Sequence, residues 1–539
     1  MPSLSREAFA ALVQAHAASG RTIAVPIALR VLSDQLTPVL AYRRLVAADD
    51  RKEPSFLFES VEGGERQGRY SILGNKPRAA VIAKGNAVRV WHDHAKQDVL
   101  HAHEETFACD DPLALLREYA KQVQLVMPTD TRDLPACVLG GWFGYVGYDS
   151  VRYAESEKLP FSAAPQDDRS LADVSMYFFD GVTVFDHVEK VVYLVALALA
   201  APGASADHAY EDAIARLHER LATIERHSKP LRAGLLERDN APQGHSLRSN
   251  MSRAQHADMI TRAKEYIKAG DIFQVVLGQR FERESAADPF DVYRALRTVN
   301  PSPYMVYMQA DGCILVASSP EILCRVRKRD DGQLVLTNRP LAGTRRRGKT
   351  PSEDAALEHE LRADTKERAE HIMLVDLGRN DVGRVAQPGT IALPSVLEVE
   401  RYSHVMHLSS TVTGVLRSDQ DCWDALAATL PVGTISGAPK VRAMQIIDEL
   451  EPIARGPYGG GMGYVSLDGQ MDIALTLRTI VAPFSLIKQS PTGTTWTYHL
   501  QAAGGIVADS VIEDEFMETI NKSAALARAI DVAECAFRE

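Results

Sequence analysis

The sequence predicts an α+β fold built on large antiparallel β-sheets, packed as a sandwich with helices on the outside. Strand patterns follow one another in hairpin-like runs, such as segment 79–91, whose apolar residues alternate around a Gly-Asn turn. Helical patterns are grouped between these runs and do not alternate strictly with strands, as they would in a doubly wound parallel sheet. The 539 residues are 45% hydrophobic, which is ample for a large core.

The amino-terminal half is expected to be mostly β-structure, from about residue 39 to residue 200. Its aliphatic run at 191–200 is too short to span a bilayer and is rich in strand formers, so it predicts a buried strand. A helix is expected at about 207–226. The polar stretch 227–250, broken by Pro and Gly, predicts a linker. The sequence therefore predicts two regions, residues 1–230 and 245–539.

The carboxy-terminal half is expected to begin with a helix near 252–269, with a capping box of Ser252 and Gln255 and a stop at Gly270. A long strand should follow at 271–282. Further strands are predicted at 313–326, 333–344, 461–482 and 496–510, and further helices at about 352–377, 421–429, 437–450 and 514–536.

One internal similarity stands out between "GGWFGYVGYD" at 140–149 and "GGGMGYVSLD" at 459–468. It suggests a pseudo-duplicated pair of sheets sharing one core, although unrelated glycine-rich strands would look alike. Glycine weakens a strand interior, so several together indicate that another group approaches the backbone closely.

Composition excludes several classes of protein. A net charge of −11 and a pI near 5.9 disfavour nucleic acid or an anionic membrane as a partner. The six cysteines include no C-x-x-C pair, which argues against a zinc knuckle or a disulfide framework. The histidine-rich stretch 92–104 follows no familiar metal-ligand spacing and predicts a solvated hairpin edge. No apolar signal segment is present at the start, so we expect a cytoplasmic location.

Carboxylates give a better indication of chemistry. Asp364 can cap a helix with Glu367 completing the box, and Glu370 lies one turn further on. Glu515 and Glu518 stand three residues apart on one face of the last predicted helix. Two acidic helices flanking glycine-rich strands could converge on one Mg²⁺ ion, which prefers a few carboxylates and retained waters. Solvated helix faces are the alternative interpretation.

Six motifs occur in order between residues 318 and 525: "SSPEIL", "RPLAGTRRRG", "AEHIMLVDLGRND", "PVGTISGAPKVRAMQIIDELEP", "YGGGMGY" and "ETINKSAA". Together they resemble the chorismate-utilising enzymes, in particular the anthranilate synthase component I family. The amino-terminal half is similar to the same family in "FLFESVEGGERQGRYSILG".

The resemblance implies a pocket for chorismate, a small dicarboxylate, with Glu370 and Glu518 holding Mg²⁺. It implies that Glu321 protonates the departing 4-hydroxyl group and that His407 acts in the later loss of pyruvate. A general acid at neutral pH needs a raised pKa. The remaining residues implied are Thr434 and Gln274 as catalytic positions, and Gly343, Thr344, Tyr458, Arg478, Gly504 and Gly505 as substrate contacts.

Two positions suggest which nucleophile attacks the substrate ring. Family members that prepare aminodeoxychorismate carry a lysine where this chain has Ala342, and members that add water carry a lysine where it has Gln274. With neither lysine present, the resemblance implies ammonia, with anthranilate as the product. Arg345 to Arg347, just beyond this loop, are expected to be partly solvated.

The resemblance also implies partners and regulation. No segment resembles a glutaminase, so a separate glutamine amidotransferase subunit, as in a heterotetramer, is expected to supply ammonia. Residues 1–230 would form a regulatory region that contributes to a tryptophan site, and 245–539 the catalytic region. Two alternatives remain: an aminodeoxychorismate, isochorismate or salicylate synthase, and a non-catalytic tryptophan sensor. The expected tryptophan contacts are Ser60, Pro303, Tyr304 and Met305.

Overall fold

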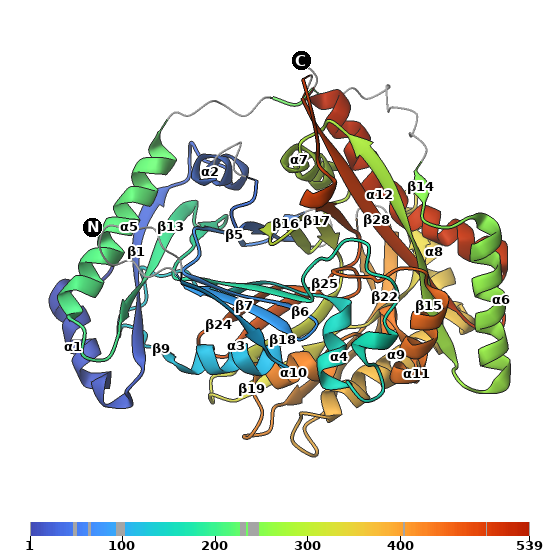
Figure 1. The fold of residues 1–539 in the computed structure, drawn as a ribbon, viewed down its shortest axis with the longest axis horizontal. Coiled ribbons are helices and arrows are strands. Elements are labelled where there is room, and N and C mark those ends of the chain that lie inside the picture. Colours follow the sequence, from blue (N-terminus) through green and yellow to red (C-terminus); the bar gives the residue numbers. More distant parts are fainter. Residues whose placement is uncertain are drawn as a thin grey trace.

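The structure is a computed structural model dominated by two large, mainly antiparallel sheets that cross the whole molecule (Figure 1). The residues that it describes are 2–46, 51–62, 66–92, 103–226, 233–235, 247–402, 405–491 and 493–537.

The first sheet contains fourteen of the described strands. Its order along the main path is β14 (Arg248–Ser249), β15 (Gln274–Ser285), β28 (Gly493–Ile506), β26 (Thr479–Pro483), β17 (Cys313–Ser319), β16 (Tyr304–Ala310), β2 (Ser55–Glu59), β5 (Tyr70–Asn75), β12 (Thr183–Asp186), β13 (Val191–Ala200), β1 (Thr22–Leu32) and β9 (Val123–Leu125), with β23 (Gly437–Ala438) beside β15 and β27 (Lys488–Ser490) beside β28.

The second sheet contains twelve of the described strands. Its order is β20 (Leu341–Arg346), β22 (Val405–Val415), β19 (Leu334–Asn338), β18 (Ile322–Lys328), β25 (Met471–Leu475), β24 (Gly461–Ser466), β10 (Gly141–Val146), β11 (Val174–Phe179), β6 (Ala79–Lys84), β7 (Ala87–His92) and β8 (His103–Ala108), with β21 (Ala392–Arg401) beside β22; β3 (Val61–Glu62) and β4 (Arg66–Gln67) pair separately.

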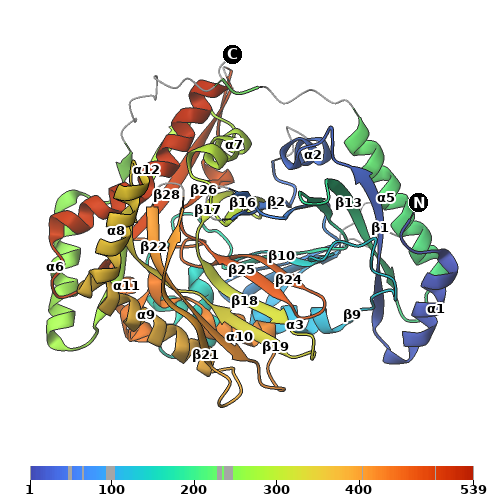
Figure 2. The same cartoon turned by 180° about the vertical axis from the view of Figure 1, so that it is seen from behind.

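Helices cover the outer faces of the sheets, as Figures 1 and 2 show from opposite sides. α12 packs on β28 and α7, α5 on β13, α9 on β22, and α10 on β18. The helices are α1 (Arg6–His16), α2 (Pro38–Leu45), α3 (Pro112–Lys121), α4 (Val151–Ala154), α5 (Ala206–Glu225), α6 (Arg253–Ala269), α7 (Pro289–Val299), α8 (Pro351–Ala363), α9 (Thr365–Gly383), α10 (Cys422–Thr429), α11 (Lys440–Leu450) and α12 (Ile512–Ala536).

The predicted fold class is confirmed, because helices flank two sheets that share an apolar core. Aromatic side chains from both sheets meet there, and the rings of Phe56 on β2 and Phe143 on β10 stack with centroids 4.3 Å apart. Every pairing in the large sheets is antiparallel except that of β1 with β9. Strands from residues 1–230 and 245–539 are neighbours in both sheets, so the two predicted regions are joined edge to edge.

The similar segments of the sequence lie side by side. β10 and β24 pair antiparallel near the middle of the second sheet, with Gly144 opposite Gly463. A Cβ atom at Gly144 would lie only 2.0 Å from the carbonyl oxygen of Ser175 on the next strand. Close approach of neighbouring backbones therefore explains the glycine at this position.

Some helix and strand boundaries agree with those predicted from the sequence, and others differ. The capping box of Ser252 and Gln255 is present, and Gly270 ends α6 in the left-handed conformation. The single helix expected at 352–377 is two helices, because Asp364 leaves the helical conformation and its carboxylate caps α9. The expected strand 313–326 is also broken, between β17 and β18 at residues 320 and 321.

Two expectations fall largely outside the described residues. They are the histidine-rich hairpin at 92–104 and the linker at 227–250. Within the ranges that the structure describes, no helix is long and apolar enough to cross a membrane.

Candidate active site

The glycine pair at the end of β28 is the centre toward which several polar side chains converge. A Cβ atom on Gly504 would lie 3.0 Å from Oε2 of Glu515 and 3.6 Å from Oε2 of Glu518, both on α12. A Cβ atom on Gly505 would lie 2.5 Å from Nε2 of Gln274. The same atom would lie 3.4 Å from a carboxylate oxygen of Glu370. Glycine therefore leaves room for these groups and for a molecule between them.

Negative charge accumulates around this glycine pair. Nε2 of Gln274 on β15 donates to Oε1 of Glu370 on α9 at 2.7 Å. Burial raises the pKa of Glu370, and the neighbouring carboxylates of Glu367 and Glu518 raise it further. Burial also raises the pKa of Glu515 to about 6. Bringing these acids together costs electrostatic free energy, so a cation at this place would be stabilised.

Lys522 supplies one such positive charge and was missing from the predicted site. Its Nζ lies 2.6 Å from Oε1 of Glu518 and donates to the carbonyl oxygen of Ala503 at 2.9 Å. A signal for it existed in the sequence. Glu515, Glu518 and Lys522 are spaced by three and four residues, which places them on one face of a helix.

The carboxylate and amide oxygens around the glycine pair are donors that suit a hard cation. They are not arranged as a complete set of ligands around one point. Among the described residues, no group of three or more His, Cys, Asp or Glu side chains is close enough to bind a metal ion. Oε2 of Glu515 and Oε1 of Gln274 are nevertheless buried without a hydrogen-bond partner. Oxygen donors of this kind are those that Mg²⁺ prefers. The residues present therefore fit such an ion.

Glu321 lies between β17 and β18 and is held in its protonated form near neutral pH. Oγ1 of Thr434 donates to its Oε1 at 2.8 Å, and the backbone N–H of Leu341 also hydrogen-bonds to the carboxyl group. Burial outweighs these bonds and raises the pKa of Glu321 to about 8. The predicted catalytic positions Glu321 and Thr434 are thus in direct contact. A carboxyl group in this state can donate a proton.

His407 on β22 faces the loop that the sequence assigned to substrate binding. Its Nδ1 lies 2.9 Å from Oγ1 of Thr344 and 3.2 Å from the carbonyl oxygen of Gly343. Gly343 has φ +74° within a β-bulge, a conformation that favours glycine. Burial first, and then the nearby Arg478, lower the pKa of His407 to about 3, so the ring is neutral.

Arg478 and Tyr458 complete the set of predicted substrate contacts. Arg478 precedes β26 with φ +48°, an uncommon conformation for a residue with a side chain, and its guanidinium interacts with Glu321 and Tyr402. Tyr458 is buried, and its pKa is raised by burial and by the negative charges of Glu451 and Glu518. Glu321 and His407 both interact with Arg478 and Lys522, and Tyr458 interacts with Glu518. We call this group of residues, together with the glycine pair, the catalytic pocket.

The three arginines of "RPLAGTRRRG" are paired with acidic residues and do not form an open anion site. Arg345 contacts Glu360, Asp364 and Glu367, which lie on or next to α8 and α9. Arg346 pairs with Glu353 at 2.6 Å and Arg347 with Asp354 at 2.9 Å. These ion pairs fix β20 against the helices and so position Gly343 and Thr344.

The four residues predicted to bind tryptophan line one cavity of about 740 Å³, which we call the inter-sheet cavity. It lies between β2, β5 and β16 of the first sheet and β18, β24 and β25 of the second. Apolar side chains such as Ile72 and Met462 form part of its wall. Arg325 and Asp472 form a charged part. The residues predicted for this site are Ser60, Pro303, Tyr304 and Met305.

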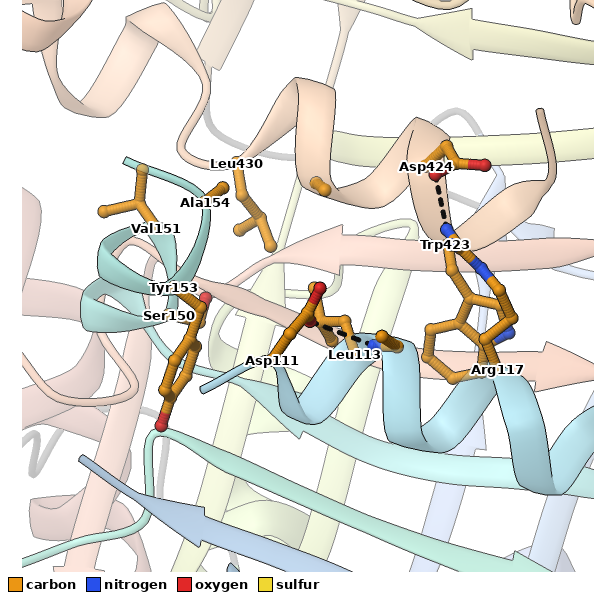
Figure 3. A pocket seen from close by; sticks show the side chains of 12 residues that line it. Asp111, Leu113, Arg117, Ser150, Val151, Tyr153, Ala154, Trp423, Asp424 and Leu430 are labelled. Carbon is orange, nitrogen blue, oxygen red and sulfur yellow. Dashed lines mark hydrogen bonds and ion pairs between the residues drawn. The ribbon is translucent and has the colours of Figure 1, made fainter. Parts of the chain in front are cut away.

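A second, much smaller cavity of about 100 Å³ lies between α3, α4 and α10, and Figure 3 shows the residues around it. None of the predicted site residues lines it. Arg117 is ion-paired there with Asp424 and Asp421, and Asp111 caps α3 through the backbone of Ala114 at 2.9 Å. The charged groups at this cavity are thus paired with one another.

Comparison with known proteins identifies the class to which this fold and site belong. Residues 54–528 match the family described as chorismate binding enzyme. The chain belongs to this family.

The relatives name a particular member of the family. The chain is 52% identical to "Anthranilate synthase alpha subunit 1, chloroplastic" of Oryza sativa subsp. indica, covering 97% of this chain and 90% of that protein. It is 43% identical to "Anthranilate synthase component 1" of Pseudomonas aeruginosa, covering 95% and 96%. The crystal structure of anthranilate synthase component I from Streptococcus pneumoniae aligns with a TM-score of 0.69 at 30% identity, covering 93% and 99%.

Replacing Glu321 with Gln should remove a pH-dependent loss of stability. The pKa of Glu321 is about 8 in the folded chain and ordinarily 4.5, so the folded chain binds this proton more tightly than the unfolded chain. The contribution of Glu321 to the free energy of unfolding is therefore largest below pH 4.5 and is lost as the pH rises through about 8. Between about pH 5 and pH 8, wild-type stability should fall more steeply than that of the variant, by about 1.4 kcal/mol per pH unit. Urea unfolding followed by tryptophan fluorescence measures both slopes.

The matched control for this prediction is Glu118→Gln, which alters an exposed glutamate of α3. Its slope should follow that of the wild-type chain. Equal slopes for Glu321→Gln and Glu118→Gln would show that Glu321 is ionised in the folded protein at neutral pH.

Proposed function

We propose that this chain is the aminating component of an anthranilate synthase. It converts chorismate and ammonia to anthranilate, pyruvate and water, and thereby begins tryptophan synthesis. The observation that carries the proposal is the convergence of a protonated Glu321 and an acidic, glycine-floored recess on one pocket. The relatives named as anthranilate synthase subunits, with 52% and 43% identity, support the same activity.

Glu321 would act as the general acid. Its proton passes to the 4-hydroxyl group of chorismate, which leaves as water while ammonia forms a bond to ring carbon 2. Thr434 keeps one oxygen of the carboxyl group hydrogen-bonded, so the proton is held on a defined side. A general acid of this kind accelerates a reaction by about 10²–10⁴-fold.

The recess around Gly504 and Gly505 would hold the ring carboxylate. Glu370 and Glu518 would bind Mg²⁺, with Glu515 beside them, and the ion would supply positive charge opposite a substrate carboxylate. Backbone N–H groups at the two glycines can approach the substrate closely, and Arg478 offers a planar pair of donors that matches a carboxylate. Tyr458 would border the ring from the adjoining buried wall.

His407 would serve the second half of the reaction, in which the amino intermediate loses pyruvate. Its Nδ1 donates to the carbonyl oxygen of Gly343 in the neutral ring, and this leaves Nε2 unprotonated. Nε2 would accept the proton from ring carbon 2 as the bond between the ring and the ether oxygen breaks and the enolate of pyruvate departs. The same proton would then pass to the methylene carbon of the enolate, which gives pyruvate and restores the neutral ring. Thr344 fixes the plane of the imidazole through its hydroxyl group.

Ammonia would come from a glutamine amidotransferase subunit, in a heterotetramer. Gln274 and Ala342 stand where other family branches place lysines, so neither supplies a nucleophile. A shielded source is favoured because most free ammonia is protonated at neutral pH.

The inter-sheet cavity would bind tryptophan as a feedback inhibitor. Its apolar wall suits an indole ring, and Ser60, Tyr304 and the charged groups offer polar partners for an amino acid. Binding there would favour a state with lower affinity for chorismate.

The purified chain, incubated with chorismate, Mg²⁺ and an ammonium salt, should produce anthranilate, which is detected by its fluorescence. At a fixed concentration of free ammonia, kcat/KM should fall above about pH 8, because Glu321 then loses its proton. Glu321→Gln should lose at least about 100-fold in kcat. A hydroxylated or aminodeoxy product would identify a different branch of the family. Tryptophan binding without turnover would identify a sensor.

Glu518→Gln should raise the Mg²⁺ concentration needed for half-maximal activity by at least about tenfold, because a charged oxygen donor is lost. Glu513→Gln is the control on the same helix, since Glu513 is exposed and pairs with Arg253. Titration of activity with Mg²⁺ measures both. Identical Mg²⁺ dependence in the two variants would remove Glu518 from the metal site.

Ala342→Lys should abolish or divert anthranilate formation, because a lysine at this position would place a competing amine beside Glu321, whose carboxyl group bonds to the neighbouring Leu341. Mass spectrometry of the products under ammonia-driven conditions shows the outcome. The control is Ala342→Met, because methionine has a side chain of similar length to lysine and no amine. A loss of activity that is caused by side-chain size alone would appear in both variants. Full anthranilate production by the lysine variant would place residue 342 away from the substrate ring.

A further inference from the structure

The inter-sheet cavity and the catalytic pocket lie on opposite sides of one short segment. Residues 318–322, which we call the crossover segment, carry the chain from β17 in the first sheet to β18 in the second. Pro320 and Ile322 line the inter-sheet cavity. Glu321 lies between them, and its carboxyl group bonds to Thr434 in the catalytic pocket. Alternate residues of an extended chain point to opposite sides, which accounts for this arrangement.

A second connection runs through the loop before β20. Arg339 also lines the inter-sheet cavity, where its guanidinium contacts Glu400 and Oγ of Ser409. Two residues later, the backbone N–H of Leu341 hydrogen-bonds to the carboxyl group of Glu321. The cavity therefore touches both the chain that carries the acid and the chain that holds it.

A third connection reaches Arg478. Met305 lines the inter-sheet cavity and is paired with Ser318 across β16 and β17. The backbone N–H of Ser318 donates to the carbonyl oxygen of Arg478 at 3.1 Å. Arg478 has φ +48°, a conformation that costs free energy and persists only while its surroundings hold it. A small movement of Ser318 would therefore act on a residue that is already strained.

The crossover segment is also a place where the sheet can adjust. The register of β18 against β25 shifts between Ile322 and Cys324, which marks a β-bulge directly after Glu321. Bulges re-aim neighbouring side chains and are frequent beside active sites. The carbonyl oxygen of Glu321 accepts from the backbone N–H of Leu475 at 3.0 Å, so its backbone is tied to β25 at the same level.

We propose that the crossover segment couples the two sites, with Pro320 and Ile322 as positioning residues that aim Glu321. A ligand that fills the inter-sheet cavity presses on these two side chains and displaces Glu321 and Arg478 from their positions toward the substrate. The ligand class is an amino acid with a large apolar side chain, and this part rests on the regulatory role proposed above. The coupling requires that the ligand contacts the segment differently in the two states.

The decisive variant is Ile322→Ala, and its matched control is Ile72→Ala on β5. Both residues line the inter-sheet cavity, and only Ile322 adjoins Glu321. Two quantities are measured on the full chain: the Kd of tryptophan by calorimetry without chorismate, and the KM for chorismate with and without saturating tryptophan in the ammonia-driven assay.

For Ile322→Ala, the Kd of tryptophan should stay within about threefold of wild type, while the tryptophan-induced increase in KM should shrink at least fivefold. Ile72→Ala should retain that increase even where its Kd is weakened. Without tryptophan, Ile322→Ala should shift the alkaline limb of kcat/KM to lower pH, because water reaches Glu321 more easily. Ile322→Val should return the alkaline limb to its wild-type pH. A general loss of structure at this position would not give that recovery.

The outcomes distinguish the regulatory tryptophan site from its coupling to Glu321 through the crossover segment. A wild-type increase in KM in Ile322→Ala, with tryptophan bound, overturns the coupling and leaves the regulatory site standing. A wild-type chain that does not bind tryptophan overturns the regulatory site and the coupling that rests on it. Should Ile322→Ala fail to fold, Ile322→Val gives the same comparison, with a KM increase reduced at least twofold if the segment transmits the signal.

Discussion

The concentration of carboxylates around Gly504 and Gly505 is the constraint on which the candidate site depends. Glu370 comes from α9, whereas Glu515 and Glu518 come from α12, and burial raises the pKa of Glu370 and of Glu515. Such a cluster is stable only with compensating groups, which here are Lys522 and Gln274. The same accumulation of negative charge is the physical basis for the proposed binding of Mg²⁺ in this recess.

Burial acts differently at the neighbouring positions, and this divides the chemistry among them. Glu321 is kept protonated, whereas His407 is kept neutral, because in each case the charged form is poorly solvated. An acid that holds its proton and an imidazole that can accept one therefore border the same pocket. Groups whose environments move their pKa values in opposite directions are characteristic of acid–base catalysis.

The two-sheet architecture places the inter-sheet cavity and Glu321 close to the same short segment of the chain. The inter-sheet cavity is built from both sheets, and the chain passes between the sheets at the crossover segment beside it. A change in how the sheets are spaced would reach Glu321 through Pro320 and Ile322. Packed sheets transmit such shifts because their interiors are dense and deform little.

Several features were determined by the sequence alone. The fold class, the capping box of α6 and the buried strand β13 all follow from local patterns of burial or capping. The repeated segments were expected to indicate a duplicated pair of sheets, whereas they form the neighbouring strands β10 and β24 of one sheet. Glu321, Glu370 and Glu518 could be named from motif resemblance. The contribution of Lys522 was missed, although its spacing from Glu518 was visible in the sequence.

Tertiary structure alone decided the rest. The contact of Glu321 with Thr434 and the raised pKa of Glu321 depend on which distant segments pack together. Residues 321 and 434 are far apart in the chain, and no local pattern states their separation in space. Burial is a property of the assembled sheets, so protonation states could be known only after the fold had placed each group.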